Sequence, residues 1–181
     1  TIRKEAIRMN FTSNHDENSW NGTEFERMGD ATDLFAAFTY VVPGMPMIYT
    51  GQMSGNHHRL EFFEKDVIDR VENAPQKALY KGLNDLRAAN RALWSNEKGA
   101  EMVRLAAGND KVFACVRTKE CPKHGNNTVI AIMNMSAEPQ TVTLDFTNLE
   151  GEYNCLCGKK MNVESTQTFE LTPWKYIILT K

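Results

Sequence analysis

Two stretches in the first half of the chain carry apolar residues at helical spacing. In residues 31–42, ATDLFAAFTYVV, apolar positions recur three and four apart, and Pro43 and Gly44 follow where a helix should end. The second stretch, residues 75–93, reads PQKALYKGLNDLRAANRAL and opens with a proline that suits the first helical turn. The pattern therefore predicts two helices, each with one buried face.

A short run rich in strand-forming residues precedes each predicted helix. These runs are residues 7–12, IRMNFT, and residues 45–51, MPMIYTG. The order strand, helix, strand, helix predicts two βα units, in which parallel strands are covered by helices. Functional side chains in such folds lie at the carboxyl ends of the strands. After the first predicted strand, that position holds Asn14, His15 and Asp16.

Past Gly99 the hydrophobic period changes to two. Short runs rich in β-branched and aromatic residues alternate with turn sequences such as GND, KHGNN and SAEP. This spacing predicts an antiparallel sandwich of six or more strands. The predicted strands cover residues 101–108, 111–118, 127–135, 140–146, 166–171 and 174–180. The fold class is α+β, with a domain boundary expected near Ser95 to Gly99, so that residues 1–96 and 97–181 form the two domains.

The charge balance narrows the expected partners. The chain has 21 basic and 23 acidic residues, and it contains no basic stripe with interleaved aromatic residues. We therefore expect no nucleic acid and no membrane as partner. No continuous apolar run reaches the length of about eighteen residues that indicates a transmembrane helix.

All four cysteines lie in the second half of the chain. Cys115, Cys121, Cys155 and Cys157 form C-x5-C and C-x-C spacings, which match none of the usual zinc patterns. We assign no metal ligands. The cysteines are interpreted as free thiols on strands, with a Cys115–Cys121 disulfide across a hairpin as the open alternative.

Acid, base and amide groups are concentrated in FTSNHDENSW, residues 11–20. A carboxylate beside an imidazole at the mouth of a parallel barrel can stabilise a cationic transition state and hydrogen-bond a polar substrate. The residues also have a structural interpretation, with Asp16 capping a turn and His15 packed as a hydrogen-bonded histidine. Both interpretations stay open on the residues alone.

Several segments in order resemble the α-amylase family, glycoside hydrolase family 13. They are FTSNHDENSW, GMPMIYTGQ, RLEFFEKD and LYKGLNDLRAANRALW. In that family an F-x-x-N-H-D segment ends the seventh barrel strand, and P-G-x-P-x-x-Y-x-G-Q marks the eighth. The resemblance covers residues 7 to about 94. It implies a partial (β/α)8 barrel, made of the last two βα units, in residues 1–96, followed by the β-sandwich domain that commonly follows the barrel.

The resemblance also implies roles for individual residues. Asp16 matches the family's third carboxylate, which stabilises the oxocarbenium-like transition state, and His15 matches its substrate-binding histidine. Asn14 would shape the turn that presents them. Trp20 and Tyr49 are candidates for lining the sugar cleft, with simple packing as the alternative for each.

Two departures from the family pattern change what is expected. Met53 stands where the family usually has a glutamate. A retaining glycosidase also needs a nucleophile and a general acid about 5 Å apart, and the family segments that supply them occur nowhere in this chain. Glu61, Glu64 and Asp66 are interpreted as solvated or capping charges, not as substitutes.

The resemblance therefore implies a fragment of a retaining α-glucan hydrolase that cleaves α-1,4-glucosidic bonds in starch or maltooligosaccharides. We expect this chain to be inactive alone, because the nucleophile and general acid would lie upstream. No cofactor is expected in the chain, and calcium would belong to upstream segments of the parent. The localisation is unknown, although analogy with enzymes of polymeric substrates favours a secreted or periplasmic parent.

Expected partners are an α-glucan, the upstream part of the barrel, and a second copy of the chain through the exposed strand edge. Two other functions stay open. One is a related α-glucan transferase, branching or trehalose-forming enzyme. The other is a non-catalytic carbohydrate-binding or structural β-sandwich module, which would present exposed aromatic residues. The aromatic residues of the tail instead lie mostly in alternating runs typical of a core: Phe113, Phe146, Tyr153, Phe169, Trp174 and Tyr176.

Overall fold

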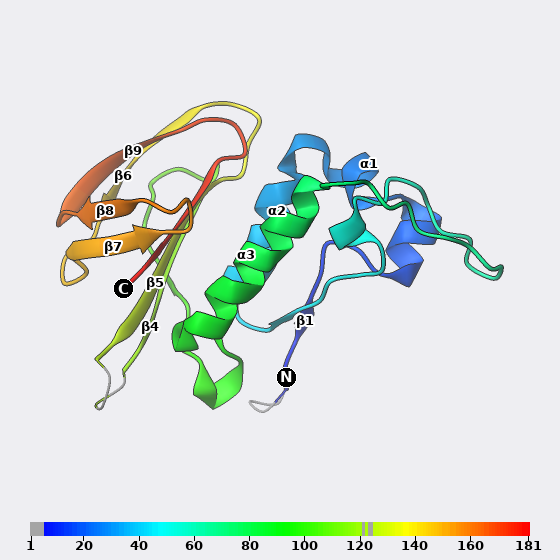
Figure 1. Cartoon of the computed structure of the whole chain (residues 1–181). Helices are drawn as coiled ribbons and strands as arrows, with labels where there is room; N and C mark the ends of the chain where they lie inside the picture. The colour runs from blue at the N-terminus through cyan, green and yellow to red at the C-terminus, as the bar shows by residue number, and fades with distance from the viewer. Residues whose placement is uncertain (1–5, 121, 123–124) are drawn as a thin grey trace.

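The computed structural model describes residues 6–120, 122 and 125–181 and has three layers. Helices α2 and α3 pack on one face of a six-stranded sheet, and a two-stranded sheet covers the other face (Figure 1). The combination of a parallel strand pair with helices and an antiparallel sandwich confirms the predicted α+β class. None of the helices in these described residues is both long and apolar enough to cross a lipid bilayer.

The two strands of the first half pair in parallel, as predicted, but they are short. Strand β1 is Met9–Asn10 and strand β2 is Met45–Pro46. The backbone N–H of Met45 donates to the carbonyl of Arg8 at 2.8 Å, and that of Met47 donates to Asn10 at 2.8 Å. Each strand has one hydrogen-bonded neighbour among the described residues, so a single short ladder holds the pair.

The two predicted helices are present. Helix α2 spans Thr32–Val41 and helix α3 spans Pro75–Ala89. Helix α3 ends before the predicted limit at residue 93, because Asn90 adopts an extended conformation with φ −115° and ψ 102°. The Asn90 side-chain amide donates to the carbonyl of Leu86 at 2.7 Å, which satisfies one carbonyl of the last helical turn. A 3-10 turn, Arg91–Leu93, follows.

Two short helical segments between β1 and α2 do not follow from the hydrophobic periodicity of the sequence. A π-helical turn covers Glu17–Asn21, and helix α1 covers Glu24–Met28. At the start of α1 the Thr23 hydroxyl accepts from the backbone of Glu26 at 3.2 Å, and the Glu26 carboxylate accepts from the backbone of Thr23 at 2.7 Å. This capping box is readable in the sequence as T-x-x-E.

The antiparallel sandwich is also present, and it contains two strands that the sequence does not reveal. The larger sheet has the order β3-β4-β5-β10-β7-β8, and β6 pairs with β9 in the smaller one. The bounds are β3 Val103–Arg104, β4 Val112–Lys119, β5 Asn127–Asn134, β6 Gln140–Asp145, β7 Gly151–Cys155, β8 Lys160–Val163, β9 Thr166–Leu171 and β10 Tyr176–Thr180. The unpredicted strands β7 and β8 lie in GEYNCLCGKKMNV, where Gly, Asn and Lys dilute the alternating pattern.

Strands β4 and β5 are buried on both faces. From β4, Ala114 and Val116 face the smaller sheet, whereas Phe113 and Cys115 pack with the helices. In β5 the same alternation places Ile130 and Ile132 against the smaller sheet. Its other buried side chains pack with the helices: Val129, Ala131 and Met133. The helical half and the sheet half therefore share one core, and the division into domains at residues 96 and 97 stays a prediction.

Arg117 joins the two halves through backbone carbonyls. Its guanidinium is buried in the structure and donates to Val41 at 3.1 Å, to Trp94 at 3.1 Å and to Ala100 at 2.9 Å. Burial lowers the pKa of Arg117 to about 10. Gly99 lies beside it, and a Cβ at that position would fall 1.7 Å from the Trp94 carbonyl oxygen. The connection between the halves is thus closely packed.

The aromatic residues of the tail lie mostly in the core, as predicted. Phe113, Phe146, Tyr153 and Phe169 are buried, and Trp174 and Tyr176 are half-buried. Among the cysteines, Cys115, Cys155 and Cys157 are free thiols, and burial raises the pKa of Cys115 to about 11. Cys121 lies outside the described residues, and because Cys115 is a free thiol the structure does not bear out the alternative of a Cys115–Cys121 disulfide.

Candidate functional site

The NHD segment, Asn14 to Asp16, lies between strand β1 and the π-helical turn, at the carboxyl end of the parallel pair. The side-chain oxygen of Asn14 accepts from the backbone N–H of Glu17 at 2.8 Å. The Asn14 carbonyl accepts from the backbone of Asn18 at 2.9 Å. Asn14 therefore closes the turn that carries His15 and Asp16.

His15 and Asp16 form an open acid–base pair. His15 Nε2 lies 3.4 Å from Asp16 Oδ2, and the side chains are 66% and 60% exposed. No side-chain hydrogen bond from Asp16 caps the π-helical turn that follows it. The structure thus disfavours the alternative of a packed histidine and a capping aspartate, and it leaves both groups accessible to a ligand.

Gln52 joins the ends of the two parallel strands, a role that was not among those predicted from the sequence. Its side chain is buried, with the oxygen accepting from the backbone of Tyr49 at 2.7 Å and the nitrogen donating to the Thr12 hydroxyl at 2.9 Å. Thr12 follows β1 and Tyr49 follows β2, so one amide fixes both chain exits beside the NHD segment. The Gly-Gln pair that ends GMPMIYTGQ was the available signal.

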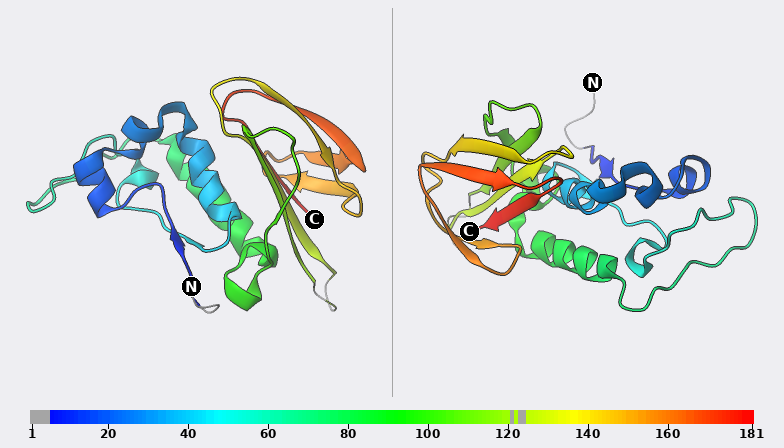
Figure 2. Two further views of the ribbon diagram at one scale, coloured as in Figure 1. Left: turned by 180° about the vertical axis from the view of Figure 1, so that it is seen from behind. Right: turned by 90° about the horizontal axis from the view of Figure 1, so that it is seen from above.

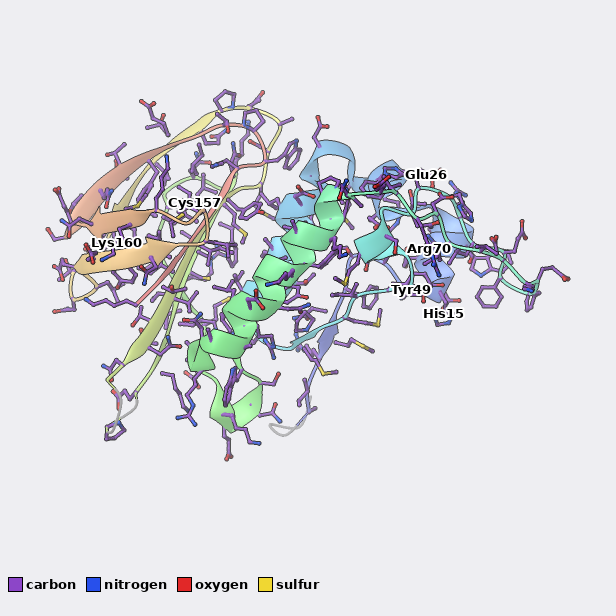
Figure 3. The ribbon with its side chains drawn as sticks, viewed as in Figure 1. His15, Glu26, Tyr49, Arg70, Cys157 and Lys160 are labelled. Carbon is purple, nitrogen blue, oxygen red and sulfur yellow. The ribbon has the colours of Figure 1, made fainter. Side chains whose placement is uncertain are left out.

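Tyr49 and Met53 lie next to this bridge. Tyr49 is half-buried, and burial raises the pKa of its hydroxyl. Figure 3 places Tyr49 and His15 at the same end of the molecule. Met53 packs against the helical core, so the position of the family's usual glutamate is apolar here. Tyr49 does not line the open pocket that Trp20 lines.

A long loop, residues 56–72, follows these segments and returns to the NHD turn. Figure 2 shows it extending from the helices on the side opposite the larger sheet. The backbone of Leu60 donates to the side-chain oxygen of Asn18 at 2.8 Å, and the Ser19 hydroxyl donates to the Leu60 carbonyl at 2.6 Å. Asn18 is itself buried, so these bonds hold the centre of the loop against the π-helical turn.

A second anchor joins the loop to helix α1. Arg59 Nε lies 3.1 Å from Glu26 Oε2, and the guanidinium contacts both carboxylate oxygens. Hydrogen bonding from Arg59, together with the capping bond from Thr23, lowers the pKa of Glu26 to about 2. Glu26 therefore serves the helix start and the loop at once.

His58 organises the far part of the loop. Its Nδ1 lies 3.0 Å from Asp69 Oδ2, and its Nε2 lies 3.4 Å from Asp66 Oδ2. Asp66 also accepts from the backbones of Glu61 at 2.9 Å and Val67 at 2.7 Å. These contacts confirm the interpretation of Asp66 as a capping charge.

Trp20 belongs to an exposed aromatic group. Its ring centre lies 5.2 Å from that of Phe62 and 6.3 Å from that of Phe63. An open pocket of about 410 Å³ lies beside these rings, and its lining is Ser19, Trp20, Arg59, Leu60, Glu61, Phe62, Phe63 and Glu64. Trp20 therefore lines a surface cavity, and its role in lining a sugar cleft stays a prediction. Glu61 and Glu64 are exposed.

No metal site was predicted. Within the part of the chain that the structure describes, no three or more His, Cys, Asp or Glu side chains are grouped to hold a metal ion.

Comparison with known proteins places these segments in a family context. No protein-family model matches the chain. The chain is 28% identical over 179 residues to "Alpha-amylase MalA" of Haloarcula japonica, a match that covers 92% of this chain and 25% of that protein. The chain thus spans about a quarter of the length of this curated relative.

Solved structures agree in fold. The maltogenic α-amylase AmyB from Thermotoga neapolitana has a TM-score of 0.75 at 19% identity, over 96% of this chain and 41% of that one. AmyP in complex with maltose has a TM-score of 0.59 at 19% identity, over 89% of this chain and 35% of that one. The resemblance to the α-amylase family, glycoside hydrolase family 13, is therefore confirmed in sequence and in fold, and it has the partial coverage expected of the carboxyl-terminal part of such a protein.

Proposed function

We propose that this chain is the carboxyl-terminal part of a retaining α-glucan hydrolase acting on α-1,4-glucosidic bonds. The observation that carries the proposal is the exposed His15–Asp16 pair at the carboxyl end of a parallel strand pair, within the F-x-x-N-H-D segment. The curated α-amylase match supports the same reaction class. The structure of AmyP contains bound maltose, which supports an α-glucan as the substrate class.

In this proposal Asp16 stabilises charge on the reacting sugar, and His15 holds that sugar in position. The Asp16 carboxylate would stabilise the positive charge that develops on the sugar ring as the glycosidic bond breaks. The His15 imidazole would hydrogen-bond a hydroxyl of the same sugar. Asn14 and Gln52 hold the turn and the strand ends, so they serve as positioning residues.

The reacting nucleophile and general acid would come from upstream barrel strands. Each of β1 and β2 has a free edge in the described residues, and the apolar side chains of Ile7, Met9, Phe11 and Met45 around them are exposed. Further parallel strands of a barrel would pair with these edges and cover these side chains. We therefore expect the chain alone to hydrolyse no starch, and measurable hydrolysis by the purified chain would contradict this.

The test begins with the native protein in its source, recovered with an antibody raised against this chain. We expect a mass far above 20.6 kDa and hydrolysis of maltooligosaccharides. An Asp16→Asn change in the source gene should lower kcat at least about a hundredfold with an unchanged amount of protein, because a transition-state interaction is lost. Glu170→Gln, which changes an exposed carboxylate of β9 far from the NHD segment, is the matched control.

The products separate hydrolysis from the related transferase function. A hydrolase increases the number of reducing ends, whereas a transferase redistributes chain lengths at a constant number. A native mass of 20.6 kDa without hydrolysis would contradict the proposal and favour a carbohydrate-binding or structural module. Any calcium that the parent requires would bind in its upstream segments.

A further inference from the structure

We propose that Cys155 and Cys157 form a redox-active thiol pair, which hydrogen peroxide converts to a disulfide within a single turn of the chain. The pair lies in the turn that joins β7 and β8. Figure 3 shows Cys157 on the far side of the helices from His15. The inference therefore goes beyond the proposed function and does not depend on it.

The turn has the hydrogen bonds of a three-residue hairpin loop. The backbone N–H of Gly158 donates to the Cys155 carbonyl at 2.8 Å, and that of Cys155 donates to the Lys159 carbonyl at 2.7 Å. Gly158 has a φ of 83°, the left-handed conformation that closes such loops and favours glycine. Cys155 and Cys157 are thus the first and third residues of a tight turn, which brings them closer together than an extended strand does.

The side chains of the two cysteines also converge. The backbone N–H of Cys157 donates to Cys155 Sγ at 3.3 Å, and a hydrogen bond joins the two thiols. Two cysteines can be bridged without backbone movement only where their Cα atoms are close and their side chains point towards each other. The turn meets this requirement while both thiols are still reduced.

The two thiols differ in reactivity. Cys157 is exposed, and its pKa is lowered below the ordinary value of 9.0 by hydrogen bonds with the Cys155 thiol and the backbone of Lys159, and by the Lys159 charge. Cys155 is half-buried, and burial together with the hydrogen bond to Cys157 raises its pKa. Because the thiolate is the nucleophile, Cys157 attacks the oxidant and Cys155 is the resolving thiol.

The oxidation takes two balanced steps. The Cys157 thiolate attacks one peroxide oxygen, the O–O bond breaks, and the departing hydroxide takes a proton from solvent to become water, which leaves Cys157 as a sulfenic acid. Cys155 then loses its proton and attacks the Cys157 sulfur, so that an S–S bond forms, the S–O bond breaks and a second water leaves. Two electrons pass from the thiols to the peroxide oxygens.

The turn around the pair is fixed to the rest of the fold. Leu156, between the two cysteines, donates its backbone N–H to the Ile178 carbonyl at 2.9 Å, and its side chain packs against the helical core. Lys160 Nζ lies 2.6 Å from Glu152 Oε1 on the paired strands. A disulfide across one residue closes a very short loop and adds little stability, so an exposed bond of this kind stays open to reduction.

The experiment treats the 181-residue chain with hydrogen peroxide, alkylates the remaining thiols after unfolding, and digests the product with trypsin. Trypsin cleaves after lysine and arginine, so the peptide of residues 124–159 carries Cys155 and Cys157 and no other cysteine. We expect mass spectrometry to show this peptide without alkyl groups after peroxide, and with two alkyl groups when a dithiol reductant precedes alkylation. A peptide that peroxide leaves alkylated at both cysteines would overturn the proposal.

Two variants separate the roles of the thiols. Cys155→Ser should leave Cys157 as a sulfenic acid that dimedone captures, whereas Cys157→Ser should slow oxidation of the remaining thiol at least about tenfold. Cys121→Ser is the control, and we expect it to form the same disulfide as the unaltered chain. A disulfide from Cys157 to Cys121, or one between two chains, would refute the pairing. An unchanged oxidation rate in Cys157→Ser would refute the role of Cys157 as the attacking thiol.

Discussion

At the scale of single residues, two buried polar side chains hold the site and the core together. Gln52 bridges Thr12 and Tyr49 at the ends of the parallel strands. Arg117, on β4, donates to backbone carbonyls of α2 and of the segment from Trp94 to Ala100, and so links these parts of the chain. Neither contact follows from periodicity, because each joins residues that are remote in the sequence. Buried polar groups of this kind stabilise a fold only while their partners stay in place.

We predict that Gln52→Ala lowers the free energy of unfolding by about 1–3 kcal/mol. The substitution leaves the partly buried N–H of Tyr49 without its acceptor and opens a cavity between the strand ends. Urea unfolding monitored by circular dichroism measures the change. The control is Gln76→Ala in the first turn of α3, where we expect a change within about 0.5 kcal/mol. Equal unfolding midpoints for the two variants would refute the bridging role.

At the scale of elements, the loop 56–72 depends on the charge of one histidine. Hydrogen bonding to Asp69 and the charges of Asp69 and Asp66 raise the pKa of His58 above its ordinary value of 6.5. A raised pKa in the folded state means that the protonated histidine stabilises this arrangement. That stabilisation is complete below about pH 6.5 and is lost as the pH rises through the raised pKa.

We predict that an NMR titration gives a His58 pKa above 6.5 in the unaltered chain and a lower value in Asp69→Asn. The substitution removes both the hydrogen-bonded carboxylate and its charge. Amide exchange in the loop, corrected for the intrinsic rate, should become faster as the pH passes through that value. Glu64→Gln serves as the control, since Glu64 is an exposed carboxylate of the same loop and the carboxylates that pair with His58 are Asp66 and Asp69. An identical His58 pKa in all three proteins would contradict the ion-pair account.

At the scale of the whole molecule, the two ends differ in how completely they are covered. The larger sheet is packed on both faces, against α2 and α3 and against β6 and β9. Among the described residues, each strand of the parallel pair has one unpaired edge, and exposed apolar side chains surround the pair. Unpaired strand edges with apolar neighbours promote association.

We predict that the isolated chain self-associates through β1 and β2 as its concentration rises. Met9→Lys should shift the equilibrium towards monomer in sedimentation velocity experiments, because it places a charge on the exposed edge. The control is Val103→Lys, which places the same charge on β3, an edge strand of the larger sheet. A clean monomer at high concentration would refute self-association. Dispersal by Val103→Lys alone would assign the contact to the other sheet.

The sequence by itself determined the helices α2 and α3, most of the sandwich strands and the position of NHD after a strand. Those features depend on local periodicity and on a motif of adjacent residues, which the chain carries wherever it folds. Only the tertiary structure decided which face of β4 meets which core, how Gln52 and Arg117 are bonded, and that Phe62 and Phe63 return to Trp20. It also paired β7 with β8, whose local pattern is weak. These outcomes depend on contacts between distant segments, and no local pattern encodes which of them form.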